Sequence, residues 1–134
     1  MPIVNKIGIT QKVVVFDRDG KFLTIQRSKT APVHALCWDL PGGELEYGED
    51  PVSGIKRETT EEAGIEISNI KPFDVYGKDH GNDVGFWVTI AYRAEAVSTD
   101  VKLSYEHDDF KWVTAEEFLK LPSSEKLVKF IENV

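Results

Sequence analysis

Bulky apolar residues alternate with other residues along several stretches of the chain, which is the pattern of half-buried β-strands. The clearest stretch is residues 84–96, where every second side chain from Val84 to Tyr92 is apolar or aromatic. Similar reasoning predicts strands at residues 9–16, 21–27, 36–40, 67–76 and 109–113. The Asp-Arg-Asp-Gly sequence at residues 17–20 is a turn signal, so the first two strands of the chain are expected to form a hairpin.

A helix is predicted at residues 51–63. Asp50 fits an N-cap and Pro51 fits the first helical position, while Gly64 fits the helix stop. Gly54 lies in the middle of this helix, where it is expected to cost up to about 1 kcal/mol relative to alanine.

Two shorter helices are predicted near the C-terminus. Thr114 and Glu117 form a capping box that opens the first of them, and Pro122 ends it. The second begins near Ser124 and carries one apolar stripe, formed by Leu127, Phe130, Ile131 and Val134. The full order, β-β-β-α-β-β-β-α-α, predicts an α/β fold in which helices cover the faces of a mixed sheet.

Length, charge and composition limit what the chain can be. Its 134 residues fit one domain, residues 1–134, that buries roughly two-thirds of the unfolded chain's surface. The net charge of −7 argues against non-specific binding to nucleic acid, which needs a basic face. Cys37 is the single cysteine, so neither an intrachain disulfide nor a thiolate zinc site is expected. The sequence shows no signal peptide and no run long enough to span a membrane, so a cytoplasmic location is expected.

One segment of the chain follows a fixed register. Residues 43–65 read GELEYGEDPVSGIKRETTEEAGI, which matches G-x5-E-x7-R-E-U-x-E-E-x-G-U, where U is a bulky apolar residue. The matched positions are Gly43, Glu49, Arg57, Glu58, Glu61, Glu62, Gly64 and Ile65, and Thr59 replaces the first apolar residue. This register resembles the Nudix box of the Nudix (MutT-like) hydrolases. The resemblance implies a Nudix-like α/β/α sandwich, with a mixed β-sheet and helices on both faces.

The carboxylates of the predicted helix lie on one side of it. Glu58 and Glu62 are one turn apart and about 40° apart around the axis, while Glu61 lies about 60° to the other side of Glu58. Like charges at these spacings cost only about 0.2–0.5 kcal/mol per pair in solvent. Taken alone, the helix could therefore present nothing more than a solvated acidic face.

The preceding loop favours a metal site over a solvated face. Gly42 and Gly43 allow a tight turn that brings a peptide carbonyl toward the helix, and Glu49 returns just before the N-cap. Four carboxylates about 6 Å apart would cost roughly 3 kcal/mol per close pair. Mg²⁺ or Mn²⁺ would offset this repulsion, because these hard cations take oxygen ligands and leave positions for water and phosphate.

The resemblance also implies roles for single residues. It assigns the divalent metal to Glu58, Glu61, Glu62 and the carbonyl of Gly42. Arg57 and Glu49 would support these ligands, because Arg57 would pair with a glutamate and orient the helix carboxylates. Mg²⁺ is the expected ion and Mn²⁺ is a substitute; the ion would draw charge from a pyrophosphate oxygen and activate water.

The sequence leaves the general base open. Members of the family use either a box glutamate, here Glu58 or Glu61, or a glutamate from a later loop. Residues 106–113 resemble the later E-H-x-x-x-x-W-V element of the family, which makes Glu106 a candidate base or fourth metal ligand. The alternative for Glu106 is a polar loop residue before a strand.

The candidate substrate contacts are spread along the chain. Arg27 ends the inward row of its strand, where many family members carry an arginine that contacts phosphate; the alternative is a surface salt bridge. Gly43 and Trp87 are further substrate-binding candidates, and Trp87 could stack on a base from the more open face of its strand. Trp38 and Phe86 are expected in the core.

The predicted activity is metal-dependent cleavage of the diphosphate linkage in a nucleoside diphosphate joined to another group. Nucleoside triphosphates, including oxidised ones, are candidate substrates, and small-molecule nucleotides are the expected partners. One alternative is a catalytically silent nucleotide-binding or regulatory module. Another is an RNA 5′-end pyrophosphohydrolase, which would need a basic track such as Lys12, Arg27, Lys78 and Arg93. The oligomeric state is open, and a homodimer through the aromatic strands is compatible with the sequence.

Overall fold

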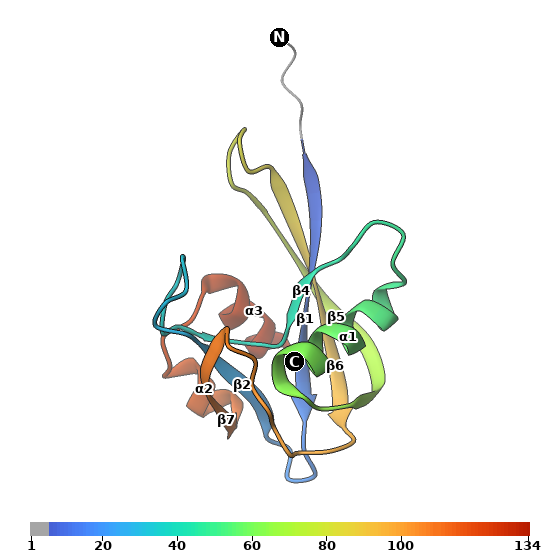
Figure 1. Ribbon diagram of the computed structural model, residues 1–134, viewed down its shortest axis with the longest axis vertical. Helices are drawn as coiled ribbons and strands as arrows, with labels where there is room; N and C mark the ends of the chain where they lie inside the picture. The colour runs from blue at the N-terminus through green and yellow to red at the C-terminus, as the bar shows by residue number, and fades with distance from the viewer. Residues whose placement is uncertain (1–5) are drawn as a thin grey trace.

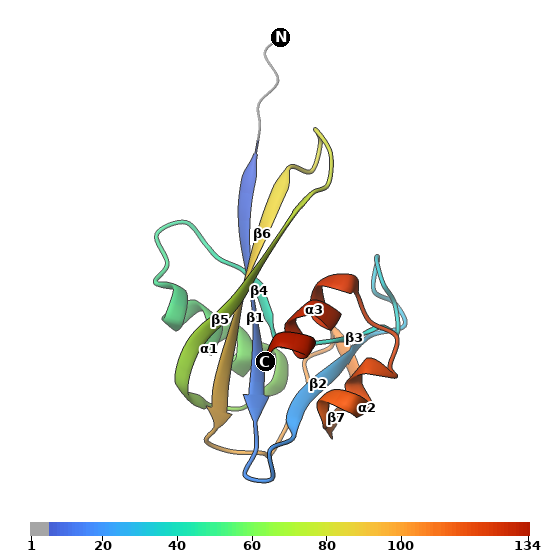
Figure 2. The same ribbon diagram turned by 180° about the vertical axis from the view of Figure 1, so that it is seen from behind.

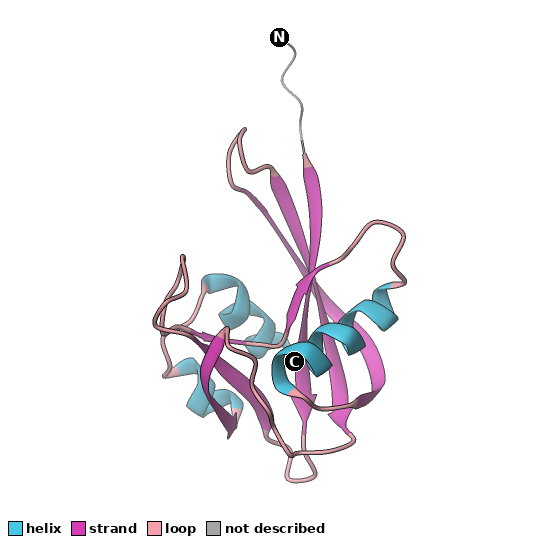
Figure 3. Cartoon of the chain, viewed as in Figure 1, coloured by secondary structure: helices cyan, strands magenta, loops and turns pink. Residues whose placement is uncertain are grey.

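The structure, a computed structural model, describes residues 6–134 and forms one mixed sheet with helices on both faces (Figure 1 and Figure 3). The strands are β1 (Ile7–Phe16), β2 (Phe22–Arg27), β3 (Trp38–Asp39), β4 (Gly42–Glu44), β5 (Ile67–Asp79), β6 (Phe86–Ala96) and β7 (His107–Val113). The helices are α1 (Pro51–Ala63), α2 (Ala115–Leu119) and α3 (Glu125–Asn133). Residues 1–5, which the predicted domain and the signal-peptide prediction include, lie outside the described residues.

The sheet has the strand order β3-β2-β1-β6-β5, with β4 paired to β1 and β7 paired to β2. β1 and β6 are parallel and in register along the whole of β1, and the other pairings are antiparallel. Central strands of such a sheet are covered on both faces. Val13, Val14 and Val15 are accordingly all fully buried, which explains the continuous apolar run in β1.

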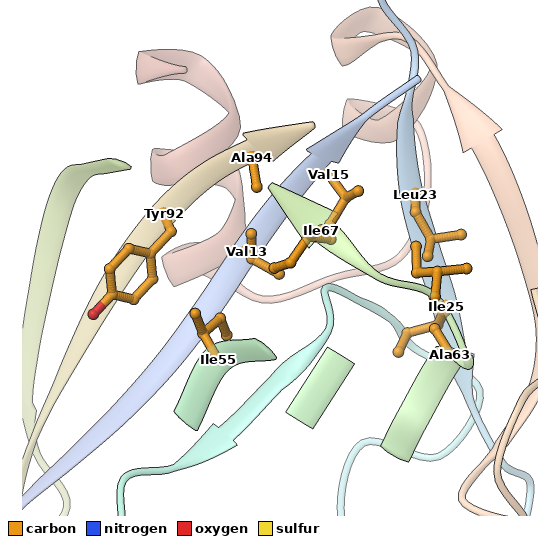
Figure 4. Close-up of a cluster of buried hydrophobic side chains, with 10 residues drawn as sticks. Val13, Val15, Leu23, Ile25, Ile55, Ala63, Ile67, Tyr92 and Ala94 are labelled. Atoms are coloured by element: carbon orange, nitrogen blue, oxygen red, sulfur yellow. The ribbon is translucent and has the colours of Figure 1, made fainter. Parts of the chain in front are cut away.

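Two hydrophobic clusters lie on opposite faces of the sheet. On one face, Ile55 and Ala63 of α1 pack with Val13 in the cluster of Figure 4. On the other face, Phe118 of α2 and Phe130 of α3 belong to a second cluster; Figure 2 shows this side of the molecule. The three layers form the α/β/α sandwich that the resemblance implied, so the predicted fold class is confirmed.

The helix ends follow the predicted capping residues. The Asp50 carboxylate accepts a hydrogen bond from the Ser53 backbone N–H at 3.0 Å, and Gly64 closes α1 with φ +68°. Thr114 and Glu117 form the capping box of α2. The prediction of α1 at residues 51–63 is confirmed. None of the helices among residues 6–134 has the length and apolarity that crossing a membrane requires.

β4 was not predicted, because the Pro-Gly-Gly sequence at residues 41–43 suggests that a strand ends there. In the structure, a strand begins at Gly42. It pairs antiparallel with β1, with Gly42 opposite Lys12 and Gly43 opposite Gln11. A Cβ on Gly42 would lie 1.9 Å from the Gln11 carbonyl oxygen, and its φ is +153°. Gly42, which suggested the end of a strand, therefore allows β4 and β1 to approach closely enough to pair.

The hairpin of β5 and β6 is also longer than predicted, because β5 continues through the first part of the predicted loop to Asp79. Figure 1 shows this hairpin and the start of β1 projecting beyond the helices. Phe86 lies on the projecting part and is 41% exposed, so the prediction that it is in the core is wrong. In the alternating apolar row of β6 that runs from Phe86 to Tyr92, Tyr92 is the one buried residue. Val134 lies beyond the end of α3 and is half-buried.

Candidate active site

Arg57 of α1 lies at the centre of a group of carboxylates. Its Nε lies 2.8 Å from Glu49 Oε2, and its Nη2 lies 3.1 Å from Glu49 Oε1. Its Nη2 and Nη1 also lie 3.2 Å from Glu58 Oε1 and 3.2 Å from Glu61 Oε2, respectively. Arg57 therefore fixes one carboxylate from the loop before α1 and two from α1 itself. We refer to Glu49, Glu58, Glu61 and Glu62 as the carboxylate cluster.

Gly54 has a packing role in α1 that offsets its low helix propensity. A Cβ at this position would lie 2.9 Å from Glu49 Oε1 and 3.0 Å from Gln11 Oε1. The Glu49 carboxylate thus lies against the helix backbone, in the position from which it reaches Arg57. The missing side chain makes room for this contact.

Glu62 is held separately from the other carboxylates. Its Oε1 accepts a hydrogen bond from the Gly42 backbone N–H at 2.7 Å, and its Oε2 lies 3.9 Å from His107 Nε2. The side chain is 14% exposed. Burial raises the pKa of Glu62 to about 7, against the opposing effects of the Lys12 ammonium and the Gly42 N–H. Glu62 can therefore gain or lose a proton near neutral pH.

Gly43 allows β4 to approach α1. A Cβ on Gly43 would lie 2.7 Å from the carboxylate of Glu58, so any other residue would displace that side chain. Burial raises the pKa of Glu58, and the neighbouring charge of Arg57 opposes this rise. The two glycines at the start of β4 therefore lie against two different glutamates. Gly42 donates its backbone N–H to Glu62, and Gly43 leaves room for the Glu58 carboxylate because it has no side chain.

The donor set of the carboxylate cluster fits a hard divalent cation. Glu58, Glu61 and Glu62 offer carboxylate oxygens only, which suit Mg²⁺-like ions and not soft metals. Within residues 6–134, no three His, Cys, Asp or Glu side chains are already gathered in a metal-holding arrangement. The reason is that Arg57 holds Glu58 and Glu61 while the Gly42 N–H holds Glu62. Binding an ion therefore requires at least Glu61, the most exposed of the three, to turn away from Arg57.

The segment before β7 runs along the end of α1. The backbone N–H of Ser104 donates to the Glu62 carbonyl at 3.1 Å, and that of Lys102 donates to the Ala63 carbonyl at 2.8 Å. Glu106 follows, and its carboxylate is exposed and forms no ion pair with the described residues. His107, for which the sequence indicated no special role, is buried beside Glu62, and burial lowers the pKa of its imidazole. The structure therefore brings His107, the neighbour of Glu106, to Glu62, whereas the Glu106 side chain is exposed.

A cavity of about 540 Å³ lies on the α3 side of the sheet, next to the cluster. Thr10 and Thr89 lie side by side in it, with their hydroxyl oxygens 2.7 Å apart. Trp38 and Trp87 both line the cavity, although Trp38 is otherwise buried in the core as predicted. Gly43 lines it as well, so one residue borders both the cavity and Glu58.

Lys12 and Asp39 form a buried ion pair in this cavity. Lys12 Nζ lies 3.0 Å from Asp39 Oδ1, and the side chains are 13% and 12% exposed. Burial opposes both charges, but each charge stabilises the other, so the pKa of Lys12 is raised and that of Asp39 is lowered. The sequence analysis missed this pair. In the sequence, the sign of this ion pair was a lysine directly before three valines and an aspartate between Trp38 and Leu40.

Arg27 lies at the rim of the same cavity. Its Nε donates to the Val33 carbonyl at 3.1 Å, and its Nη1 lies 3.7 Å from Asp39 Oδ2. Lys12, Arg27 and Lys78 line the cavity, whereas the guanidinium of Arg93 lies 5.3 Å from the ring of Phe16 and does not. Three of the four cations considered for an RNA-binding track therefore lie together, and Asp39 pairs with two of them.

The fold and the site define a class of protein: an α/β domain with a row of carboxylates on one helix and a cavity beside them. The sequence model of the NUDIX domain family matches residues 7–134, so the chain belongs to the NUDIX domain family. Hydrolases of this family generally need a divalent metal ion. The predicted family, Nudix (MutT-like) hydrolases, is confirmed.

Known relatives and a solved structure agree with this membership. The chain is 32% identical over 104 residues to the "MutT-like protein" of Streptomyces ambofaciens, covering 78% of this chain and 62% of that protein. It is 30% identical over 115 residues to the "Putative 8-oxo-dGTP diphosphatase 2" of Mycobacterium tuberculosis, covering 86% and 77%. The MutT protein from Methanosarcina mazei Go1 superposes with a TM-score of 0.79 at 30% identity, covering 96% of this chain and 92% of the other. The predicted class, a hydrolase of diphosphate bonds, agrees with these names.

Proposed function

We propose that this chain is a metal-dependent pyrophosphohydrolase that cleaves the diphosphate linkage in a nucleoside diphosphate joined to another group. The observation that carries the proposal is the position of Gly43, which borders the cavity on one side and the Glu58 carboxylate on the other. A nucleotide in the cavity can therefore extend its diphosphate past Gly43 to the carboxylate cluster.

The cluster would hold Mg²⁺, with Mn²⁺ as a substitute, through Glu58, Glu61, Glu62 and the Gly42 carbonyl. When bound, the cation supplies Lewis-acid polarisation of a diphosphate oxygen and activation of water. Arg57, anchored by Glu49, orients Glu58 and Glu61.

Two other groups act on the substrate and on the attacking water. Arg27, which lines the cavity, would contact phosphate once a substrate draws it from the Val33 carbonyl. The base is a carboxylate that accepts the proton of the attacking water, and the candidates are Glu58, Glu61 and the exposed Glu106. Glu106 precedes His107, which lies beside Glu62.

Nucleoside triphosphates, including oxidised ones, are the proposed substrates. The cavity is large enough for a small ligand, and both its aromatic walls and its paired Lys12 and Asp39 suit a nucleoside. The Mycobacterium tuberculosis relative is named for 8-oxo-dGTP, an oxidised nucleoside triphosphate. A cytoplasmic location and the oligomeric state stay predictions, and light scattering would decide between a monomer and a homodimer.

A nucleotide panel tests this proposal directly. The purified protein is incubated with nucleoside triphosphates, 8-oxo-dGTP and nucleoside diphosphate conjugates, with Mg²⁺ or Mn²⁺, and products are separated by chromatography. We expect nucleoside monophosphate to appear, and EDTA to abolish its formation. Tight nucleotide binding without turnover under either metal would instead identify a silent nucleotide-binding module.

A further inference from the structure

The ring of Trp87 packs against the backbone of Gly8. The two residues are direct partners in the parallel pairing of β1 and β6. A Cβ on Gly8 would lie 2.3, 2.4 and 2.5 Å from three atoms of the six-membered ring of Trp87. The indole therefore lies against the backbone of β1, and any residue other than glycine at position 8 would push it away.

The ring is also fixed by its polar atom. Trp87 Nε1 donates a hydrogen bond to the Val84 carbonyl at 3.0 Å, so the indole N–H is satisfied within the protein. Lys6 Nζ lies 5.1 Å from the ring centroid, at the end of a flexible stem that can yield to a ligand. Gly8 and Val84 thus set the ring plane before any substrate enters, while Trp87 still lines the cavity.

The position of this ring along β1 suits one end of a nucleotide. Gly8 lies three residues before Gln11, the residue that pairs with Gly43 in β4. Three residues of a β-strand span roughly 10 Å, so the ring and the carboxylate end of the cavity are separated by about that length. Thr10 and Thr89 lie between them. A base at the ring leaves the sugar and phosphates to extend toward Gly43.

We propose that Trp87 is the stacking platform for the base of the substrate and that Gly8 is the positioning residue that holds the platform in place. This inference rests on the proposed function, because it assumes a nucleotide in the cavity. Every nucleobase has a π face, so stacking is tolerant of base identity. The platform selects phosphate compounds that carry a planar base over those that carry none, and it discriminates little among the bases.

The same hairpin contains a matched control. Phe86 is the neighbour of Trp87 in β6 and points to the opposite face of the sheet. It too lies over a glycine, since a Cβ on Gly77 would be 2.8 Å from Phe86 Cζ. Phe86 does not line the cavity. Changes at Phe86 and Gly77 therefore disturb the same hairpin without touching the platform.

Binding of AMP, GMP, CMP, UMP and ribose 5-phosphate, measured by calorimetry, tests the platform. Trp87→Ala should weaken binding of all four nucleotides roughly 5- to 100-fold, the range that stacking on one aromatic ring gives. Binding of ribose 5-phosphate, which has no base, should not change. Gly8→Ala should weaken the four nucleotides in the same selective way, and Trp87→Phe should retain most of their affinity. Phe86→Ala and Gly77→Ala should leave all five ligands unchanged.

Two results would overturn the inference: equal losses for ribose 5-phosphate and the nucleotides in Trp87→Ala, or no loss for either. Circular dichroism of each variant shows whether it folds. If Trp87→Ala does not fold, Trp87→Phe is the variant that tests the platform. These measurements need no turnover, so they separate the platform from the reaction. If no nucleotide is hydrolysed while binding follows the expected pattern, the proposed function fails and the platform stands. If nucleotides are hydrolysed and Trp87→Ala leaves KM unchanged, the platform fails and the proposed function stands.

Discussion

The carboxylate cluster and the cavity differ in how far apart their parts lie in the chain. The cluster and the two glycines that shape it come from residues 42–62, and most of its contacts join side chains at most eight positions apart. The cavity is lined by residues from 10 to 127, contributed by strands on both sides of β1 and by the start of α3. The part proposed for the chemistry is thus encoded in one local segment, whereas the part proposed for recognition exists only once the chain has folded.

The largest effect is expected from Glu62→Gln. This change keeps the shape of the side chain and removes a proposed metal ligand, so we expect kcat to fall at least about a hundredfold. Steady-state kinetics on the best substrate of the panel measures it. Glu116→Gln, at an 85% exposed side chain of α2, is the control and should retain full activity. Near-normal activity of Glu62→Gln would remove this residue from the metal site.

On the cavity side, Lys12→Met should destabilise the fold by about 3 kcal/mol, because the buried Asp39 loses its nearer cation, at 3.0 Å, and keeps only Arg27, at 3.7 Å. Urea denaturation measures the loss. The matched change is Lys120→Met, whose pair with Glu116 is almost fully exposed and should contribute less than about 1 kcal/mol. Similar losses in the two variants would show that the cavity pair is no more buried in solution than a surface pair.

Gly43→Ala probes the border between the two regions. The new Cβ would meet the Glu58 carboxylate at 2.7 Å and displace it, and we expect a roughly thirtyfold loss of kcat. Gly48→Ala is the control: its φ of +79° strains an alanine, yet nothing lies near the added Cβ. This control should lose about 1 kcal/mol of stability and keep its activity. An active Gly43→Ala enzyme would mean that Glu58 can function from another position.

The stability of the metal-free protein is expected to depend on pH. Burial raises the folded-state pKa of Glu62 from 4.5 to about 7, so its contribution to stability is fully present below pH 4.5 and is lost as pH rises through 7. Glu62→Gln removes this loss. With EDTA present, we expect the variant to be up to roughly 3 kcal/mol more stable than wild type at pH 8, and the difference to vanish near pH 4.5. Thermal unfolding at both pH values measures it, and a difference independent of pH would contradict the assignment to Glu62.

The contrast between the two regions also explains what the sequence could predict. Asp50, Gly64 and the Thr114 capping box act on neighbouring residues, so their helices were placed correctly. The residues of the carboxylate cluster could be named for the same reason, because they lie within one helix and the loop before it. Gly54 shows the limit of local reasoning: it is unfavourable in an isolated helix, and its value depends on Glu49 and on Gln11 of a distant strand.

Features that depend on distant partners were missed or mistaken. β4 forms because β1 lies beside Gly42, and no signal within residues 41–43 reveals that neighbour. The ion pair of Lys12 and Asp39 joins residues 27 positions apart on strands that do not pair directly. Phe86 follows a core-like alternation, yet it begins β6 in the hairpin that projects beyond the helices (Figure 1) and is exposed. Burial of a strand residue is decided by what lies above it, which alternation alone does not specify.

The most direct test of the account is a crystal structure of the protein soaked in Mn²⁺, with the ion located by its anomalous signal. We expect a peak at coordination distance from carboxylate oxygens of Glu58 and Glu62, with Glu61 turned away from Arg57 to join them. No peak beside these side chains, together with an unchanged contact between Arg57 and Glu61, would contradict the claim that the cluster is a metal centre.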